Sequence, residues 1–255
     1  MGVSGGVQVG TGNRVLSFDR VGKRFADGTV AVRDVDLTVG AGEFVSVVGP
    51  SGCGKSTLLR LASGLSRPTA GRVHTGSAEI GYVFQDPNLL AWRSVAANVE
   101  LGAELKRLPG PDRRRRVEAA LDLVGLRGVE RQLPRTLSGG MRMRVSLARC
   151  LVLDPDLCLF DEPFGALDEL TRERLNDELL ALHRARGFSG LFVTHSVGEA
   201  VYLSTRVVLM SPRPGRIIAD IPVPFGPSRT RDLRFTAEFT DLVARVSRGL
   251  RDGER

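Results

Sequence analysis

Three short motifs in this 255-residue chain hold residue types that can do chemistry on a phosphate group. Residues 49–57, Gly-Pro-Ser-Gly-Cys-Gly-Lys-Ser-Thr, fit the pattern G-x-x-x-x-G-K-[ST] in full. Its glycines let the backbone curl so that successive N–H groups point at the β-phosphate of a nucleotide. Lys55 adds a cation, and Ser56 offers a hydroxyl to Mg²⁺, which prefers oxygen ligands. The residues expected to contact the nucleotide are Gly49, Pro50, Ser51, Gly52, Cys53, Gly54, Lys55, Ser56 and Thr57.

An acidic pair, Asp161 and Glu162, directly follows the apolar run 157–160. If that run is a strand, the pair lies at the carboxyl edge of a sheet, where open α/β folds bind their ligands. Asp161 is suited to hold Mg²⁺ through its waters. Glu162 is placed to orient and deprotonate the water that attacks the γ-phosphate. Together with the phosphate loop, the pair predicts the binding and hydrolysis of ATP.

Two further polar residues end apolar runs in the same way. His195 follows the run 191–194 and could hydrogen-bond the γ-phosphate. A single histidine is more often structural, but its place at a strand end favours the phosphate. Gln85 follows the run 79–84 and can reach the metal or the attacking water as a neutral donor and acceptor. The candidate catalytic residues are Lys55, Gln85, Glu162 and His195, and the candidate metal ligands are Ser56, Gln85 and Asp161.

A third motif, Leu-Ser-Gly-Gly-Met at 137–141, lies just upstream of the acidic pair. Ser138 can cap a helix whose positive end and free N–H groups would stabilise a γ-phosphate. Residues 49–57 already form a complete phosphate cradle. A second phosphate-binding turn therefore implies that something else presents a nucleotide to it.

The elements that must position these motifs alternate along the chain. The patterns predict strands at 15–25, 31–39, 44–48, 79–85, 157–160, 191–194 and 207–210. They predict helices at about 55–65 and 169–186, another after a capping box of Ser196 and Glu199, and a mainly helical insertion over 88–135 that continues through a helix beginning near Ser138. Alternating strands and helices imply a mostly parallel sheet covered on both faces.

Prolines break up residues 212–227, and a closing helix follows them. This helix is expected to dock onto the domain through an apolar stripe formed by Phe239, Leu242, Val243, Val246 and Leu250.

Composition fits one large domain, because 42% of the residues are hydrophobic and 25% are charged. Lys and Arg outnumber Asp and Glu by 36 to 29, but only 5% of the residues are aromatic. A solvated basic surface is therefore favoured over nucleic-acid binding, for which stacking platforms would be interleaved with the charges. Cys53, Cys150 and Cys158 fit no zinc spacing and are expected to be reduced thiols in a cytoplasmic protein.

Residues 1–13 are expected to be a flexible tail, because they lack the basic start and apolar core of a signal peptide. No apolar run approaches the ~20 residues that span a bilayer. The basic run 113–116 is interpreted as a solvated helix face, with contact to anionic lipid head groups as the alternative.

In their order and wording, these motifs resemble those of the nucleotide-binding subunit of an ABC transporter, over roughly residues 14–225. The resemblance implies an α/β P-loop NTPase with a RecA-like core and an antiparallel β subdomain. It adds an inserted helical subdomain at about 88–150 and leaves 226–255 as a C-terminal helical extension.

The resemblance also implies a head-to-tail homodimer with two ATP molecules at its interface. Ser138, Gly139 and Gly140 would face the phosphate loop of the other subunit, and Asp168 matches the loop that contacts that subunit. Phe25 matches the aromatic residue that stacks on adenine, with core packing as the alternative.

The wording of residues 84–93 and 137–144 is similar to the nitrate, sulfonate and taurine importer branch, which also includes transporters of other small organic solutes, although Met141 stands where many members have Gln. The implied partners are a two-subunit integral-membrane permease, gripped by the helical subdomain, and an extracytoplasmic solute-binding protein. The chain would lie at the cytoplasmic face of the membrane as a peripheral subunit.

Two rival functions are considered. A soluble ABC-type ATPase that acts on nucleic acid, ribosomes or iron–sulfur assembly would carry a coiled-coil or zinc-bearing insertion, or two cassettes, and the sequence contains neither. A regulatory module that binds ATP without turnover conflicts with an intact Glu162 and His195.

Overall fold

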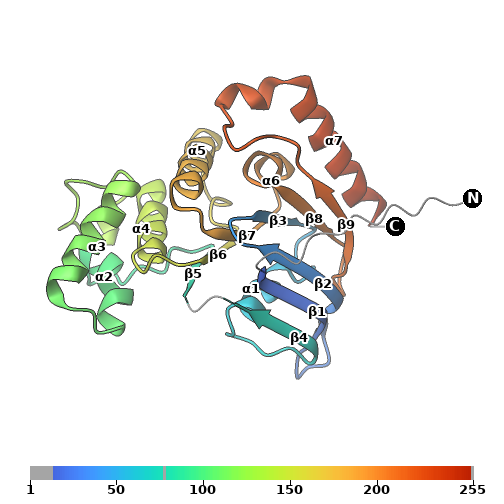
Figure 1. The fold of residues 1–255 in the computed structure, drawn as a ribbon, viewed down its shortest axis with the longest axis horizontal. Coiled ribbons are helices and arrows are strands. Elements are labelled where there is room, and N and C mark those ends of the chain that lie inside the picture. Colours follow the sequence, from blue (N-terminus) through green and yellow to red (C-terminus); the bar gives the residue numbers. More distant parts are fainter. Residues whose placement is uncertain (1–13, 77–78, 254–255) are drawn as a thin grey trace, which may run out of the picture.

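The computed structural model describes residues 14–76 and 79–253, and Figure 1 shows how their elements are arranged. The strands are β1 (Arg14–Arg24), β2 (Val30–Gly40), β3 (Phe44–Val48), β4 (Ala70–Thr75), β5 (Ile80–Val83), β6 (Leu157–Asp161), β7 (Ser189–Thr194), β8 (Arg206–Met210) and β9 (Ile217–Pro222). The helices are α1 (Lys55–Ala62), α2 (Val95–Leu105), α3 (Gly110–Leu123), α4 (Gly139–Leu151), α5 (Glu169–Arg186), α6 (Val197–Leu203) and α7 (Ala237–Asp252), with short 3-10 turns η1 (Pro134–Thr136) and η2 (Arg231–Phe235). The expected tail at 1–13 lies outside the described residues.

Two sheets form the centre of the fold. The larger has six strands in the order β5-β6-β7-β3-β8-β9, of which β9 pairs antiparallel and the others pair parallel. The smaller is antiparallel, in the order β2-β1-β4. This arrangement confirms the predicted α/β fold with a mostly parallel core sheet and an antiparallel β subdomain.

The parallel strands are continuous apolar runs because both of their faces are buried. In β3, Val45 and Val47 belong to a core shared with α1 and the antiparallel sheet, whereas Phe44 and Val48 belong to a core shared with the helices on the other face. Successive side chains of a strand point to opposite faces, so one short run fills both cores.

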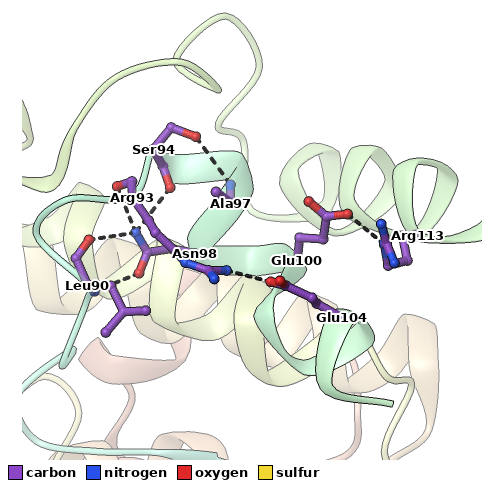
Figure 2. A network of polar contacts seen from close by, with 8 residues as sticks. All are labelled: Leu90, Arg93, Ser94, Ala97, Asn98, Glu100, Glu104 and Arg113. Carbon is purple, nitrogen blue, oxygen red and sulfur yellow. Dashed lines mark hydrogen bonds and ion pairs between the residues drawn. The ribbon is translucent and has the colours of Figure 1, made fainter. Parts of the chain in front are cut away.

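Helices α2, α3 and α4 form a group beside the sheets, at the left of Figure 1, within the predicted helical insertion. Figure 2 shows the polar contacts that order its first loop. Asn98, fully buried, accepts the N–H of Leu90 at 2.8 Å, and its amide nitrogen donates to the carbonyls of Leu90, Arg93 and Ser94 at 3.0–3.1 Å. One amide side chain therefore holds the whole turn from Leu90 to Ser94.

Helix α7 docks on the helix side of the larger sheet, as its apolar stripe predicted. Phe239, Leu242 and Val246 are buried there, and Val243 and Leu250 pack against the same core. Within the described ranges, no helix is both long enough and apolar enough to cross a membrane.

Strands β4 and β9 are the elements that the sequence patterns missed. Strand β4 is an edge strand, and its single large apolar residue, Val73, is only partly buried. Strand β9 is also an edge strand and ends at Pro222 in the proline-rich stretch. Edge strands with solvated side chains lack the apolar runs on which the other predictions depended.

Candidate nucleotide site

The phosphate loop connects β3 to α1 and needs glycine at two positions. Gly52 and Gly54 have φ values of 75° and 110°, which side-chain-bearing residues rarely adopt. At Gly54 an added Cβ would also lie 2.6 Å from the side chain of Val32 and 2.8 Å from the carbonyl oxygen of Ala31. The glycine spacing of the motif is therefore required by the backbone as well as by a phosphate.

Lys55 opens α1 and is 5% exposed. Its Nζ donates to the carbonyl oxygens of Gly49 at 2.9 Å and Pro50 at 3.1 Å, and lies 3.5 Å from Oε1 of Glu162. The ammonium group thus lies between the phosphate loop and the acidic pair, where it can meet a phosphate that enters the loop.

Asp161 ends β6 and lies beside Ser56. The Ser56 hydroxyl donates to Oδ1 of Asp161 at 2.7 Å, and the Tyr82 hydroxyl donates to Oδ2 at 3.3 Å. Burial raises the pKa of Tyr82, with a further rise caused by the Asp161 carboxylate. Tyr82 therefore stays a neutral donor. The oxygens of Ser56 and Asp161 are the hard donors that Mg²⁺ prefers, so these two residues fit the ion.

Glu162 and His195 are brought together because β6 and β7 are neighbours in the sheet. Oε2 of Glu162 lies 3.0 Å from Nδ1 of His195. The backbone of Glu162 has a φ of 45°, and its N–H donates to the carbonyl of Val193 at 2.9 Å. This left-handed turn directs the carboxylate across the end of the sheet, between Lys55 and His195.

An open cleft of about 490 Å³ is lined by Lys55, Ser56 and Glu162, whereas Asp161 and His195 do not line it. Its lining includes Phe25, 42% exposed, and Gln85, so the structure brings both predicted residues to the same cleft as the phosphate loop. Asp27 and Arg213 also line it, and the sequence patterns missed both. Asp27 could have been found as part of the turn that follows Phe25, but no motif points to Arg213, whose Nε donates to the Gly52 carbonyl at 3.0 Å.

The Ser138 turn is built as predicted but lies outside this cleft. Ser138 is the N-cap of α4, and its Oγ accepts the N–H of Met141 at 3.2 Å. An added Cβ would lie 3.3 Å from the Leu167 side chain at Gly139 and 3.0 Å from the Thr171 side chain at Gly140. The two glycines therefore allow the turn to pack closely on the loop that carries Asp168.

Asp168 is itself the N-cap of α5, where its Oδ1 accepts the N–H of Thr171 at 3.0 Å. This hydrogen bond lowers the pKa of the Asp168 carboxyl. The residues lining the cleft at the phosphate loop include neither Asp168 nor the Ser138 turn. Within one chain, the Ser138 turn and Asp168 thus lie outside the cleft, and Gly139 lines a second hollow together with Gln85.

The capping box predicted after His195 is present in a modified form. Ser196 is the N-cap of α6 and accepts the N–H of Glu199 at 3.3 Å. In a capping box, the Ser196 N–H would donate to the carboxylate of Glu199. In the structure it donates instead to the hydroxyl of Thr194, at 3.0 Å.

Comparison with known proteins agrees with this geometry. The family described as ABC transporter matches residues 32–165. A taurine import ATP-binding protein of Roseobacter denitrificans is 44% identical over 221 residues, which are 82% of this chain and 82% of that protein. An aliphatic sulfonates import ATP-binding protein of Bacillus licheniformis is 44% identical over 211 residues, which are 79% of this chain and 82% of that protein.

Solved structures are similar over the whole domain. A dimeric ATP-binding cassette in a post-hydrolysis state, bound to ADP and Pi, has a TM-score of 0.73 and 30% identity, covering 83% of this chain and 100% of that chain. A protein of Clostridium perfringens that is part of an ABC transporter complex has a TM-score of 0.77 and 26% identity, covering 92% of this chain and 97% of that chain.

Proposed function

Because this chain belongs to the ABC transporter family, we propose that it powers the import of a small organic solute through a separate membrane permease. The chain is an ATPase. The alternative hypothesis, a soluble ATPase that acts on nucleic acid, ribosomes or iron–sulfur assembly, has no support among these relatives. One observation carries the proposal: two relatives at 44% identity are both import subunits, and the solutes that they are named for share a sulfonate group. We therefore propose taurine-like or alkanesulfonate-like solutes.

We propose the following roles in hydrolysis. Lys55 leaves its contacts with the loop carbonyls to hold the β- and γ-phosphates. Ser56 and Asp161, assisted by Gln85, would hold Mg²⁺, which would neutralise charge on the phosphates. Glu162 orients and deprotonates the attacking water.

His195 and Phe25 would contact the two ends of the nucleotide. His195 hydrogen-bonds the γ-phosphate while its Nδ1 stays close to Glu162. Phe25 stacks on adenine from the wall of the cleft, a position that its 42% exposure and its place beside the phosphate loop support.

A homodimer would complete each site. The Ser138 turn and Asp168 are exposed on a surface separate from the cleft of their own chain, so a second copy has to supply the cleft that they face. The similar dimeric cassette supports this arrangement.

We place the permease contact on the helical group. Trp92 is 77% exposed and Leu105 is 75% exposed there, and Asn98 holds the Trp92 loop in a fixed shape (Figure 2). We propose that the permease covers both side chains. With a permease bound at this surface, the chain would lie peripherally at the cytoplasmic face of the membrane, and an extracytoplasmic binding protein would deliver the solute.

Purification of the tagged chain from its native membranes tests the proposal. We expect a two-subunit permease and a solute-binding protein to copurify. In proteoliposomes, the binding protein loaded with taurine or an alkanesulfonate should stimulate ATP hydrolysis, whereas the same protein with sulfate should not. Stimulation by an unrelated solute class would contradict the sulfonate assignment, and copurification with DNA or ribosomes alone would contradict the transport function.

A further inference from the structure

A buried polar cluster lies behind His195, and it is separate from the residues that line the cleft. It contains Thr194, Glu199 and Asn176, which are 2%, 6% and 4% exposed, and the guanidinium of Arg172. Each of the last three has a buried atom that makes no hydrogen bond within the described chain: Oε1 of Glu199, Oδ1 of Asn176 and Nε of Arg172. A buried polar atom without a hydrogen-bond partner lowers the folding stability. The presence of three such atoms in one cluster therefore suggests that the cluster has a function.

Glu199 closes a ring of hydrogen bonds around the backbone of His195. The Thr194 hydroxyl donates to Oε2 of Glu199 at 2.5 Å and accepts the N–H of Ser196 at 3.0 Å. Ser196 in turn accepts the N–H of Glu199. Because Thr194 and Ser196 flank His195, this ring fixes the backbone from which the imidazole reaches Glu162.

Arg172 joins the same cluster to the loop that carries Asp168. Its Nη2 donates to the carbonyl of Leu167 at 3.0 Å, and the Leu167 side chain packs under Gly139 of the Ser138 turn. Burial raises the pKa of Glu199, and Thr194 and the charge of Arg172 oppose that rise. The guanidinium contacts the Leu167 carbonyl through Nη2, and its Nη1 lies 3.5 Å from Oε2 of Glu169.

We propose that Glu199 is a positioning residue that holds the backbone of His195 through Thr194 and Ser196. Glu199 does not line the cleft and acts through the residues that it holds. These hydrogen bonds lie within a single chain. The role of the held imidazole at the γ-phosphate rests on the proposed function.

Nuclear magnetic resonance of the histidine rings tests whether Glu199 holds His195. This measurement requires neither ATP hydrolysis nor dimer formation. The chain has three histidines, so the His195 ring signals can be followed beside those of His74 and His183. Glu199→Ala should displace the His195 signals and leave the other two in place. Glu199→Gln should restore them, because an amide oxygen still accepts the Thr194 hydroxyl. The matched control is Glu118→Ala, at an exposed position on α3.

Steady-state kinetics tests whether Glu199 acts through His195. Glu199→Ala should lower kcat about tenfold and change the KM for ATP less than about twofold, since a misplaced catalytic group slows chemistry more than binding. In a His195→Ala background the same substitution should have almost no further effect, because the two residues then form one coupled unit.

Two results would overturn the positioning role: unmoved His195 signals in Glu199→Ala, or a kcat loss that is as large in the His195→Ala background as in the parent. Gel filtration of Glu162→Gln with ATP tests the proposed dimer separately. If Glu162→Gln stays monomeric with ATP, the dimer proposal is wrong, while the ring signals still decide whether Glu199 holds His195.

Discussion

At the scale of residues, Glu162 lies between an ammonium group and an imidazole, one beside each carboxylate oxygen. One carboxylate oxygen lies 3.5 Å from Nζ of Lys55 and the other lies 3.0 Å from Nδ1 of His195. In the proposed mechanism, movement of Lys55 to a phosphate would release the Oε1 side of Glu162 to bind water. The left-handed backbone at Glu162, which costs a non-glycine residue roughly 1–2 kcal/mol, is the local expense of aiming the carboxylate there.

Replacement of the base should separate binding from hydrolysis. Glu162→Gln keeps the size of the side chain and one acceptor oxygen but cannot take a proton, so turnover should fall by about 10²–10⁴. ATP binding, measured by equilibrium titration, should remain. Glu118→Gln, at an exposed glutamate on α3, is the control and should retain full activity. A Glu162→Gln protein that hydrolyses ATP at the parent rate would remove Glu162 from the mechanism.

The lowered pKa of a second residue, His183, should make the folding stability depend on pH. Burial lowers the pKa of His183, whose ring meets the rings of Phe44 and Phe188 edge-on at 5.1 and 5.3 Å. The unfolded chain therefore binds a proton at this residue more readily than the folded chain does. As the pH falls through about 6.5, folding stability is lost, and the loss is complete below the lowered pKa of the folded state.

This prediction is checked by thermal unfolding at pH 7.5 and 5.5. His183→Gln keeps a donor for the Gly42 carbonyl, which lies 3.2 Å from Nε2 of His183, and removes the titration. The Tm of His183→Gln should fall less between the two pH values than the Tm of the parent. His74→Gln, at an exposed histidine, should behave like the parent. An equal fall in all three proteins would show that other groups set the acid sensitivity.

At the scale of elements, largely apolar runs predicted β3, β6 and β7 because two cores meet on these strands, and a residue of the site ends or follows each one. Strands β4 and β9 were missed because few of their side chains are buried: none in β4, and only Ile221 in β9. Both lie at sheet edges, where solvated side chains and proline are tolerated. Their pairing with β1 and β8, not a local apolar pattern, makes them strands.

The same distinction applies to the site. The phosphate loop was predictable because its glycines and Lys55 act through local backbone geometry. Arg213 in the cleft was not, because its contact with Gly52 spans the chain and carries no spacing rule. The close packing of Gly140 on Thr171 and the relay through Thr194 likewise depend on tertiary contacts.

The loop after Gln85 offers a prediction at this scale. Asn98→Ala removes the four hydrogen bonds that Asn98 makes to residues 90–94, leaving groups around a buried position unpaired at a cost of about 1–3 kcal/mol. The Tm should fall, and the fluorescence anisotropy of Trp92, the chain's single tryptophan, should fall as its loop gains motion. Gln132→Ala, an exposed amide in the same region, should change neither. Unchanged anisotropy in Asn98→Ala would mean that packing alone orders the loop.

At the scale of the whole molecule, the cleft and the Ser138 turn belong to different parts of the fold. The cleft is lined by the β1–β2 turn, the phosphate loop and the ends of β5 and β6, whereas the Ser138 turn begins a helix of the group at the left of Figure 1. Movement of the helical group relative to the sheets would therefore change the distance between the two surfaces. The proposed dimer, closed by two nucleotides, would convert ATP binding into such a motion.

The shared site is tested by a substitution on the surface that lies outside the cleft. In a Glu162→Gln background, which should accumulate ATP-bound dimers, Ser138→Arg should abolish the dimer seen by gel filtration. ATP binding by the monomer should persist, because Ser138 does not line the cleft. Arginine also removes the cap of α4, a loss of about 1 kcal/mol, so a cap control is required. Thr236→Ala removes the equivalent cap of α7 and should leave the dimer intact. Normal dimers of Ser138→Arg would place the nucleotide within one subunit, and loss of ATP binding by its monomer would assign Ser138 to its own chain's cleft.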